Sequence, residues 1–174
     1  MPETIEQYIA RIRSYAQGQE PFTILAATPG RLRSLVANVP DAQLRARPTP
    51  ERWSIMEQLA HLTDADLVIG FRVRAILGAP DGVPIAAYDQ DRWQQSMRYN
   101  DRELAPTLDA FSAIRDFNLR LYRSLDEAAM NKYGLHAERG QESVRTVIQM
   151  NAGHDLNHLR QIEAILQKSA ASVA

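Results

Sequence analysis

Two histidines, His154 and His158, stand four positions apart in the stretch "NAGHDLNHLRQIEAIL". On an α-helix that turns by about 100° per residue, such positions lie roughly 40° apart, so both imidazoles point to the same side. That side also carries the apolar residues of the stretch, which places the pair inward. Core histidines bonded to backbone carbonyls are the simpler alternative. Because imidazole is a common ligand of divalent metals, the pair is also a candidate chelate for one ion.

A third histidine, His61, lies in "WSIMEQLAHL" and points to the apolar side of its own helix. Helical bundles can bring inward histidines from separate helices to a single ion. Three histidines with the remaining positions open are the arrangement of a catalytic zinc site, whereas a fourth protein ligand would close a structural one. The sequence therefore predicts a divalent-metal site at His61, His154 and His158.

Polar residues near these histidines are candidates to support the site. Metal-bound imidazoles usually donate their other N–H to a carboxylate, an amide or a carbonyl. We expect Asp155 or Glu57 to orient a histidine or to accept a proton, although a helix-capping role competes for Glu57. Asn151 and Gln161 lie one turn on either side of the histidine pair and are further candidates.

The other charged residues are not expected to bind the metal. Asp64 and Asp66 are expected to be solvated, because unpaired carboxylates are rarely buried. His136 lies in the Gly-bounded segment "YGLHAERG", where we expect an exposed loop residue that could approach a substrate. Most arginines are scattered, as on a solvated surface, and only Arg72, near the stripe of His61, is a candidate anion contact.

Apolar residues recur at helical spacing, and no convincing run shows the period of a strand. A capping box, Ser-x-x-Glu at Ser54, begins one helix, and Thr28-Pro29 is predicted to begin another that Pro40 ends. The predicted helices are residues 3–17, about 28–39, 54–78, 106–125 and 143–168.

The long connection at residues 79–105 is predicted to hold one short helix around Asp91 to Met97. Connections of this length in compact domains are often functional, and its Tyr88, Trp93 and Tyr99 are candidates to line a pocket. The fold class is predicted as all-α: a four-helix bundle with an additional N-terminal helix and one long crossover connection.

Composition sets the class of protein. The 174 residues, 45% hydrophobic and 24% charged, fit one domain over residues 1–174. A formal charge of -1 gives no broad basic surface, so we expect neither nucleic acid nor membrane partners. The absence of cysteine excludes disulfides and a protein thiol nucleophile. No apolar segment approaches the length of a signal or spanning helix, and a cytoplasmic location is expected.

The two motifs together resemble those of the DinB-like superfamily, which includes YfiT-like metal-dependent hydrolases. The resemblance rests on Trp53-Ser54, Glu57 and His61 in the first motif and on His154, His158 and Gln161 in the second. It covers about residues 25–168. It implies a four-helix bundle whose three histidines bind zinc or nickel, and it implies homodimers. One departure is Asn157, on the polar side of its helix, where some members have another histidine.

The resemblance also implies an activity. Characterised relatives are transferases or isomerases that use low-molecular-weight thiols such as bacillithiol, mycothiol or glutathione. We therefore expect a metal-dependent thiol S-transferase acting on a small-molecule substrate. One alternative is a hydrolase that uses a metal-bound water. Another is a non-catalytic metal-binding or stress-related module, in which case the long connection should form no pocket. A metal-free protein is the last alternative.

Overall fold

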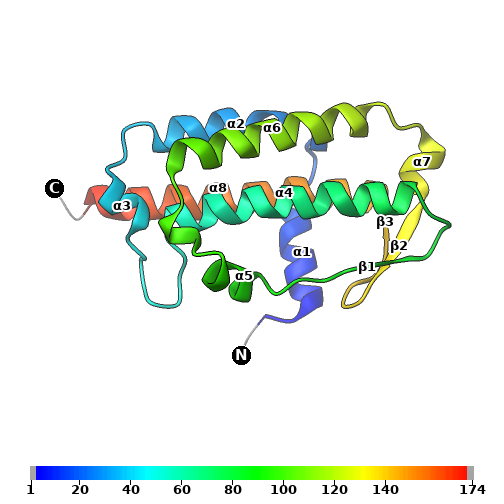
Figure 1. Cartoon of the computed structure of the whole chain (residues 1–174), viewed down its shortest axis with the longest axis horizontal. Coiled ribbons are helices and arrows are strands. Elements are labelled where there is room, and N and C mark those ends of the chain that lie inside the picture. The colour runs from blue at the N-terminus through cyan, green and yellow to red at the C-terminus, as the bar shows by residue number, and fades with distance from the viewer. Residues whose placement is uncertain (1–2, 172–174) are drawn as a thin grey trace.

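Four long helices form the body of the molecule (Figure 1). The computed structural model describes residues 3–171, and side chains only as far as residue 168. Each of α2 and α4 packs against both α6 and α8, so that α2 lies diagonally opposite α4. The predicted four-helix bundle is therefore confirmed. Its helices are α2 (Pro21–Val36), α4 (Ile55–Leu77), α6 (Leu104–Arg123) and α8 (Val144–Ala171).

The predicted long crossover joins α4 to α6. These neighbouring helices run in the same direction, so the chain returns along the length of the bundle between them (Figure 1). The short helix predicted near Asp91 is present. The return contains β1 (Val83–Ile85), α5 (Gln90–Ser96) and the 3-10 turn η1 (Tyr99–Asp101).

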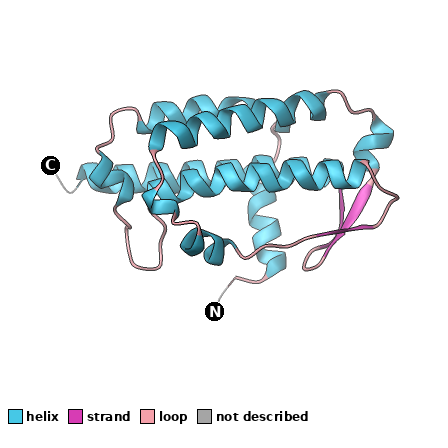
Figure 2. Cartoon of the chain, viewed as in Figure 1, coloured by secondary structure: helices cyan, strands magenta, loops and turns pink. Residues whose placement is uncertain are grey.

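Short elements cover the two ends of the bundle. At one end α3 (Asp41–Arg45) lies between α2 and α4. At the other, α6 is followed by α7 (Glu127–Asn131) and a hairpin of β2 (Tyr133–His136) and β3 (Gly140–Ser143). β1 joins β2 in parallel, while β2 and β3 are antiparallel. This small sheet (Figure 2) was not predicted, because strands of three or four residues are too short to show an alternating pattern.

The start of α4 is fixed by its capping box, as predicted. The Ser54 hydroxyl accepts a hydrogen bond from the Glu57 amide at 3.1 Å, and the Glu57 carboxylate accepts one from the Ser54 amide at 2.8 Å. These reciprocal bonds satisfy two amides that a helix start would otherwise leave free. The rest of the helix can then run uninterrupted to Gly78, carrying His61 in its second turn.

The predicted start of α2 at Thr28-Pro29 was wrong. The helix begins at Pro21, capped by Glu20, and Pro29 lies inside it. Proline lacks an N–H, so the carbonyl of Leu25, four residues earlier, loses its helical partner. That carbonyl instead accepts a hydrogen bond from Arg115 of α6 at 2.9 Å. A buried side chain from another helix thus compensates the break, which no local pattern in α2 could indicate.

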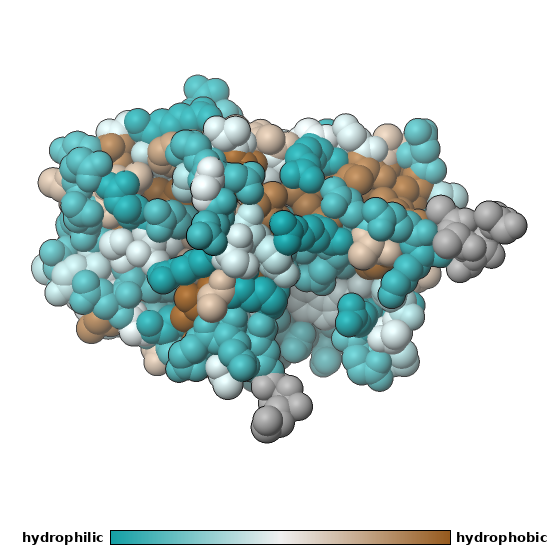
Figure 3. All heavy atoms as spheres, turned by 180° about the vertical axis from the view of Figure 1, so that it is seen from behind, coloured by the Kyte–Doolittle hydropathy of each residue, from teal (hydrophilic) through white to brown (hydrophobic). Residues whose placement is uncertain are grey.

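The additional N-terminal helix, α1 (Ile5–Tyr15), crosses the bundle and packs on α8 (Figure 1). The crossing point is Gly153, where an added Cβ would overlap the backbone of Ile12. Ile12 is itself fully buried. From behind, the lower half of the molecule, where α1 lies, shows mainly hydrophilic residues (Figure 3). Among the described residues, no helix combines the length and apolarity needed to cross a membrane.

Candidate metal centre

Three imidazoles meet where α4 faces α8. The Nε2 atom of His154 lies 3.0 Å from Nε2 of His61 and 3.2 Å from Nε2 of His158. All three residues present a ring nitrogen within 4.8 Å of the others. The helical spacing puts two of them on one side of α8, and the packing of α4 supplies the third. The structure therefore brings together the three histidines that the sequence singled out as ligands.

The distances between these nitrogens suit a shared cation. Imidazole nitrogens about 2.0–2.1 Å from a tetrahedral ion lie roughly 3.3 Å from one another. The two Nε2 separations, 3.0 and 3.2 Å, are close to that value. Three neutral imidazoles whose Nε2 atoms converge cannot all satisfy these atoms by hydrogen bonds to one another. A cation at the same point accepts a lone pair from each Nε2. The donor set thus fits a divalent metal.

Burial keeps the three rings neutral, which is the form that binds metal. Burial lowers the pKa of His154 to about 4, and the positive charge of Arg115 adds to this. The pKa values of His61 and His158 also lie well below the ordinary 6.5, first because of burial and then because of the neighbouring histidines. At neutral pH the three rings therefore carry no positive charge that would repel an incoming cation.

A glutamine that the sequence analysis did not select holds one of the rings. The Gln58 side-chain oxygen lies 3.2 Å from Nδ1 of His158, and Gln58 is almost fully buried. An oxygen acceptor at this point fixes the proton on Nδ1 and leaves the lone pair on Nε2, facing the other two histidines. Gln58 precedes His61 by three residues on α4, so both side chains lie on the same side of the helix. The same spacing argument that identified the histidines could therefore have identified Gln58.

The second nitrogens of the other two histidines have no such partner. Nδ1 of His61 and Nδ1 of His154 are buried and form no hydrogen bond with the described residues. The ring of Trp53 lies edge-on to that of His61, with 5.0 Å between centroids. Packing against Trp53 therefore holds the ring of His61 in place of a hydrogen bond to Nδ1.

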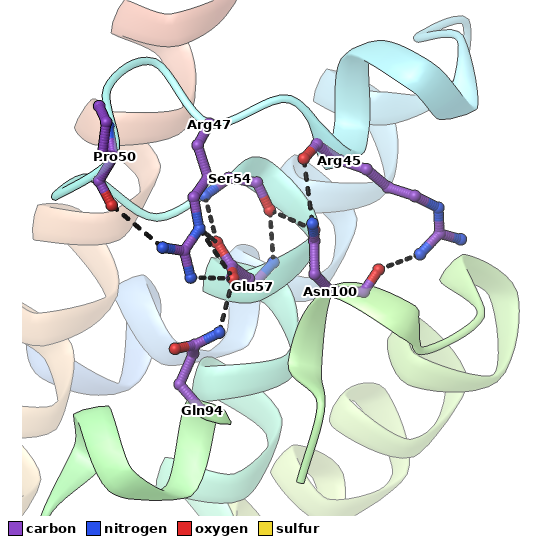
Figure 4. Close-up of polar contacts among 7 residues, drawn as sticks. All are labelled: Arg45, Arg47, Pro50, Ser54, Glu57, Gln94 and Asn100. Carbon is purple, nitrogen blue, oxygen red and sulfur yellow. Dashed lines mark hydrogen bonds and ion pairs between the residues drawn. The ribbon is translucent and has the colours of Figure 1, made fainter. Parts of the chain in front are cut away.

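Glu57 belongs to the capping network at the start of α4 (Figure 4). Its carboxylate receives hydrogen bonds from Arg47 at 2.9 Å and from Gln94 at 2.6 Å, in addition to the Ser54 amide. The Ser54 hydroxyl in turn donates to Asn100 of η1. No bond joins Glu57 to a histidine. The contacts of Glu57 therefore support its role as a helix cap. Its role as a proton acceptor stays a prediction.

Asp155 lies in a buried ion-pair network. Both of its oxygens are held by Arg115, at 2.5 and 3.1 Å, and Arg115 also donates to Asp66 at 3.1 Å. Asp66 was expected to be solvated, and this was wrong: only 1% of its surface is exposed. Its partner is Arg115 of α6, 49 residues further along the chain, so the residue spacing within α4 gave no indication that Asp66 is buried. Asp155 forms no bond to a histidine, and its predicted role at the metal stays untested.

The remaining candidates near the histidines are placed as follows. Asn151 donates to Asp66 at 3.1 Å, and Gln161 is exposed. Asn157 was expected on the polar side of α8, but it is buried, because α1 covers it and Arg11 donates to its side-chain oxygen at 2.8 Å. A helix that packs across another from outside the bundle is not visible in the pattern of the covered helix alone.

Two clefts open beside the histidines. The first, of about 430 Å³, contains His61 and His154 among its lining residues. The second, of about 340 Å³, contains His154 and His158. The long crossover contributes to both clefts, through Tyr88 to the first and Gln90 to each. The three-histidine cluster therefore faces space that a small molecule can enter.

Two basic residues predicted from the sequence also line the first cleft. His136 was expected to be an exposed loop residue, but it lies on β2 with only 3% of its surface exposed, because β1 pairs alongside it. Arg72 is likewise buried and lines the same cleft. Neither Glu57 nor Asp155 lines either cleft.

The structure is that of a helical-bundle protein with a three-histidine cluster between two of its helices. A sequence model of the DinB superfamily matches residues 24–162, and the chain belongs to this superfamily. Its fold is similar to that of YfiT from Bacillus subtilis, described as a probable metal-dependent hydrolase with an unusual four-helix bundle topology. The two share 16% identity with a TM-score of 0.81, over 86% of each chain. No curated protein is significantly similar in sequence.

Proposed function

We propose that this protein is a metal-dependent enzyme that holds one divalent ion at His61, His154 and His158 and acts on a small molecule. The observation that carries the proposal is the convergence of three neutral Nε2 atoms at 3.0 and 3.2 Å beside two open clefts. A closed structural site would need a fourth protein ligand. Among the described residues, no acidic side chain or cysteine joins the cluster to close it.

A non-catalytic module is less well supported. That alternative requires a long connection that forms no pocket, whereas the crossover lines both clefts next to the histidines. Metal binding alone would not need an open cleft beside the ion. An active site does, because substrate must reach the ion.

Within this class we propose thiol S-transfer, with zinc or nickel as the ion. A divalent cation lowers the pKa of a thiol or water bound to it, and so supplies a nucleophile at neutral pH without a protein cysteine. The chain's own residues hold this centre in place: Gln58 fixes the tautomer of His158, and Trp53 packs on His61. The sequence has no cysteine, so the thiol in this reaction would come from a separate molecule.

Hydrolysis is the second candidate, favoured by the description of YfiT. The same three ligands serve both reactions, and the clefts admit water as well as a thiol. The homodimer implied by the family resemblance also stays a prediction.

The test compares both reactions in one preparation. Zinc-loaded and nickel-loaded protein would be assayed with 1-chloro-2,4-dinitrobenzene and a set of thiols that includes glutathione and cysteine, and separately with 4-nitrophenyl acetate in the absence of thiol. Thiol-dependent product that His158→Ala abolishes would support S-transfer. Ester cleavage abolished in the same way would support hydrolysis instead. Rates equal to those of His158→Ala in both assays would contradict an enzymatic role on these substrates.

A further inference from the structure

The first cleft contains a buried cation without a counter-ion. Arg72 of α4 has 8% of its surface exposed, and its guanidinium donates one hydrogen bond, from Nη2 to the carbonyl of Ala86 at 2.6 Å. Its Nε is buried without a partner among the described residues. The ring of Tyr88 lies 5.8 Å from its Cζ. By contrast, Arg115, the other deeply buried arginine, is bound by two carboxylates.

A second donor in this cleft is also unpaired. Nδ1 of His136 accepts a hydrogen bond from the Glu138 amide at 3.2 Å. The proton of the neutral ring is therefore on Nε2, and this N–H is buried with no partner among the described residues. Arg72 and His136 come from different elements, α4 and β2, and line one cleft together with His61 and His154.

Acidic residues around the cleft do not neutralise Arg72. Glu142 is bound in two places by Arg139, at 2.7 and 2.9 Å, and Glu3 pairs with Arg11. Asp89 caps α5, and Glu138 is exposed. Burial, with the charge of Arg139, lowers the pKa of Arg72 from its usual range, as expected for a cation that lacks a balancing anion.

We propose that Arg72 and His136 bind the carboxylate of a small organic acid whose reactive end lies at the His61 and His154 side of the same cleft. This inference rests on the proposed function and names its substrate class. The guanidinium and the imidazole N–H together offer a charge-assisted pair of donors, which a carboxylate accepts with its two oxygens. Apolar side chains on the same walls, Ala65, Ile69 and Val147, suit the body of such an acid. The volume, about 430 Å³, is that of a small-molecule site.

A monoanion suits this end of the cleft better than a phosphate. A single arginine has to balance the bound charge, because Arg139 is already paired with Glu142. Glu138 and Glu142 also lie close enough to affect the charge at His136, and they would repel a dianion more strongly than a carboxylate.

The test measures anion binding to metal-free protein, so that it does not depend on the metal. Benzoate and hexanoate would be titrated by calorimetry in a buffer without other carboxylates, each beside its neutral amide and beside inorganic phosphate. We expect at least one carboxylate to bind at least about tenfold more tightly than its amide and than phosphate. Arg72→Gln should remove this preference, whereas Arg92→Gln, which removes an exposed charge on α5, should retain it.

Because Arg72→Gln alters a buried side chain, the wild-type protein supplies a second readout. The Arg72 Nε–H and His136 Nε2–H signals in a proton–nitrogen correlation spectrum should shift on saturation with the carboxylate that binds. Absence of carboxylate preference in the wild type, preferential binding of phosphate, or an unchanged preference in a folded Arg72→Gln protein would each overturn the proposal. If the carboxylate binds but no metal does, the proposed enzymatic function fails while the anion site stands.

Discussion

At the scale of single residues, the site depends on which nitrogen of each histidine carries the proton. Gln58 determines this for His158, through the 3.2 Å contact with Nδ1. Replacing Gln58 with leucine keeps the volume but leaves the ring free to take the other tautomer. We expect Gln58→Leu to weaken zinc binding about 10- to 100-fold while one ion still binds at saturation.

A competition titration with a chromophoric chelator would measure this affinity. Gln161→Leu is the matched control, because Gln161 lies on the rim of the second cleft and is exposed. Equal affinity in Gln58→Leu and in the control would show that the contact does not support the site.

The buried histidines also predict how stability depends on pH. In the folded state the pKa of His154 is about 4, against 6.5 for the unfolded chain, so the unfolded state binds more protons between these values. Stability is therefore complete above about pH 6.5 and falls as the pH decreases toward 4. In metal-free protein, His154 alone should cost about 2 kcal/mol between pH 7.5 and pH 5.

Urea unfolding at the two pH values, in the presence of a chelator, would measure this. His154→Gln removes the titrating group, and the difference in unfolding free energy between the two pH values should decrease accordingly. If the variant loses as much stability on acidification as the wild type, burial of His154 is not the cause.

Sequence reasoning was most successful with single residues on one helix side. It identified the three histidines that converge, because helical spacing fixes their direction. It failed for Asp66 and His136, whose burial depends on Arg115 and on β1, partners distant in the chain. Arg115 itself was not singled out, since nothing in its own stretch indicates that two aspartates and a carbonyl surround it.

At the scale of elements, the crossing of α1 over α8 is the contact least visible in the sequence. It requires a residue without a side chain at Gly153, where a Cβ would overlap the Ile12 backbone. Gly153→Ala should displace α1 and lower the free energy of unfolding by about 1–3 kcal/mol. Since Gly153 precedes His154, we also expect weaker metal binding.

Gly30→Ala in α2 is the control, because its surroundings are open. Alanine there should stabilise the helix by about 0.5–1 kcal/mol. Chemical denaturation of both variants would check the pair, and a Gly153→Ala protein as stable as Gly30→Ala would contradict the close crossing.

Helix ends and connections were predicted unevenly. The capping box at Ser54 and the short helix in the crossover were predicted correctly, since local hydrogen bonds and spacing define them. The start of α2 was misplaced because Thr28-Pro29 has the composition of a helix start, while Arg115 satisfies the Leu25 carbonyl that Pro29 leaves free. Helix ends were therefore predicted correctly where the hydrogen-bond partners are close in the sequence, and wrongly where the partner comes from another helix.

At the scale of the whole molecule, Arg115 of α6 links the bundle. It bonds to Leu25 of α2, Asp66 of α4 and Asp155 of α8. Arg115→Met would leave two buried carboxylates without their cation, and we expect a loss of about 3–5 kcal/mol. Thermal and urea unfolding would measure it.

Arg120→Met is the matched surface change, since Arg120 pairs with Asp116 in solvent. It should cost at most about 1 kcal/mol. Similar losses in the two variants would contradict a central role for the buried network.

The central claim is that the three histidines bind one metal ion. The direct measurement is elemental analysis of untagged protein after incubation with zinc or nickel and gel filtration, beside His158→Ala treated in the same way. The structure predicts about one ion per wild-type chain and a large loss in the variant. A wild-type protein that stays empty, or a variant that retains the same content, would contradict the metal centre.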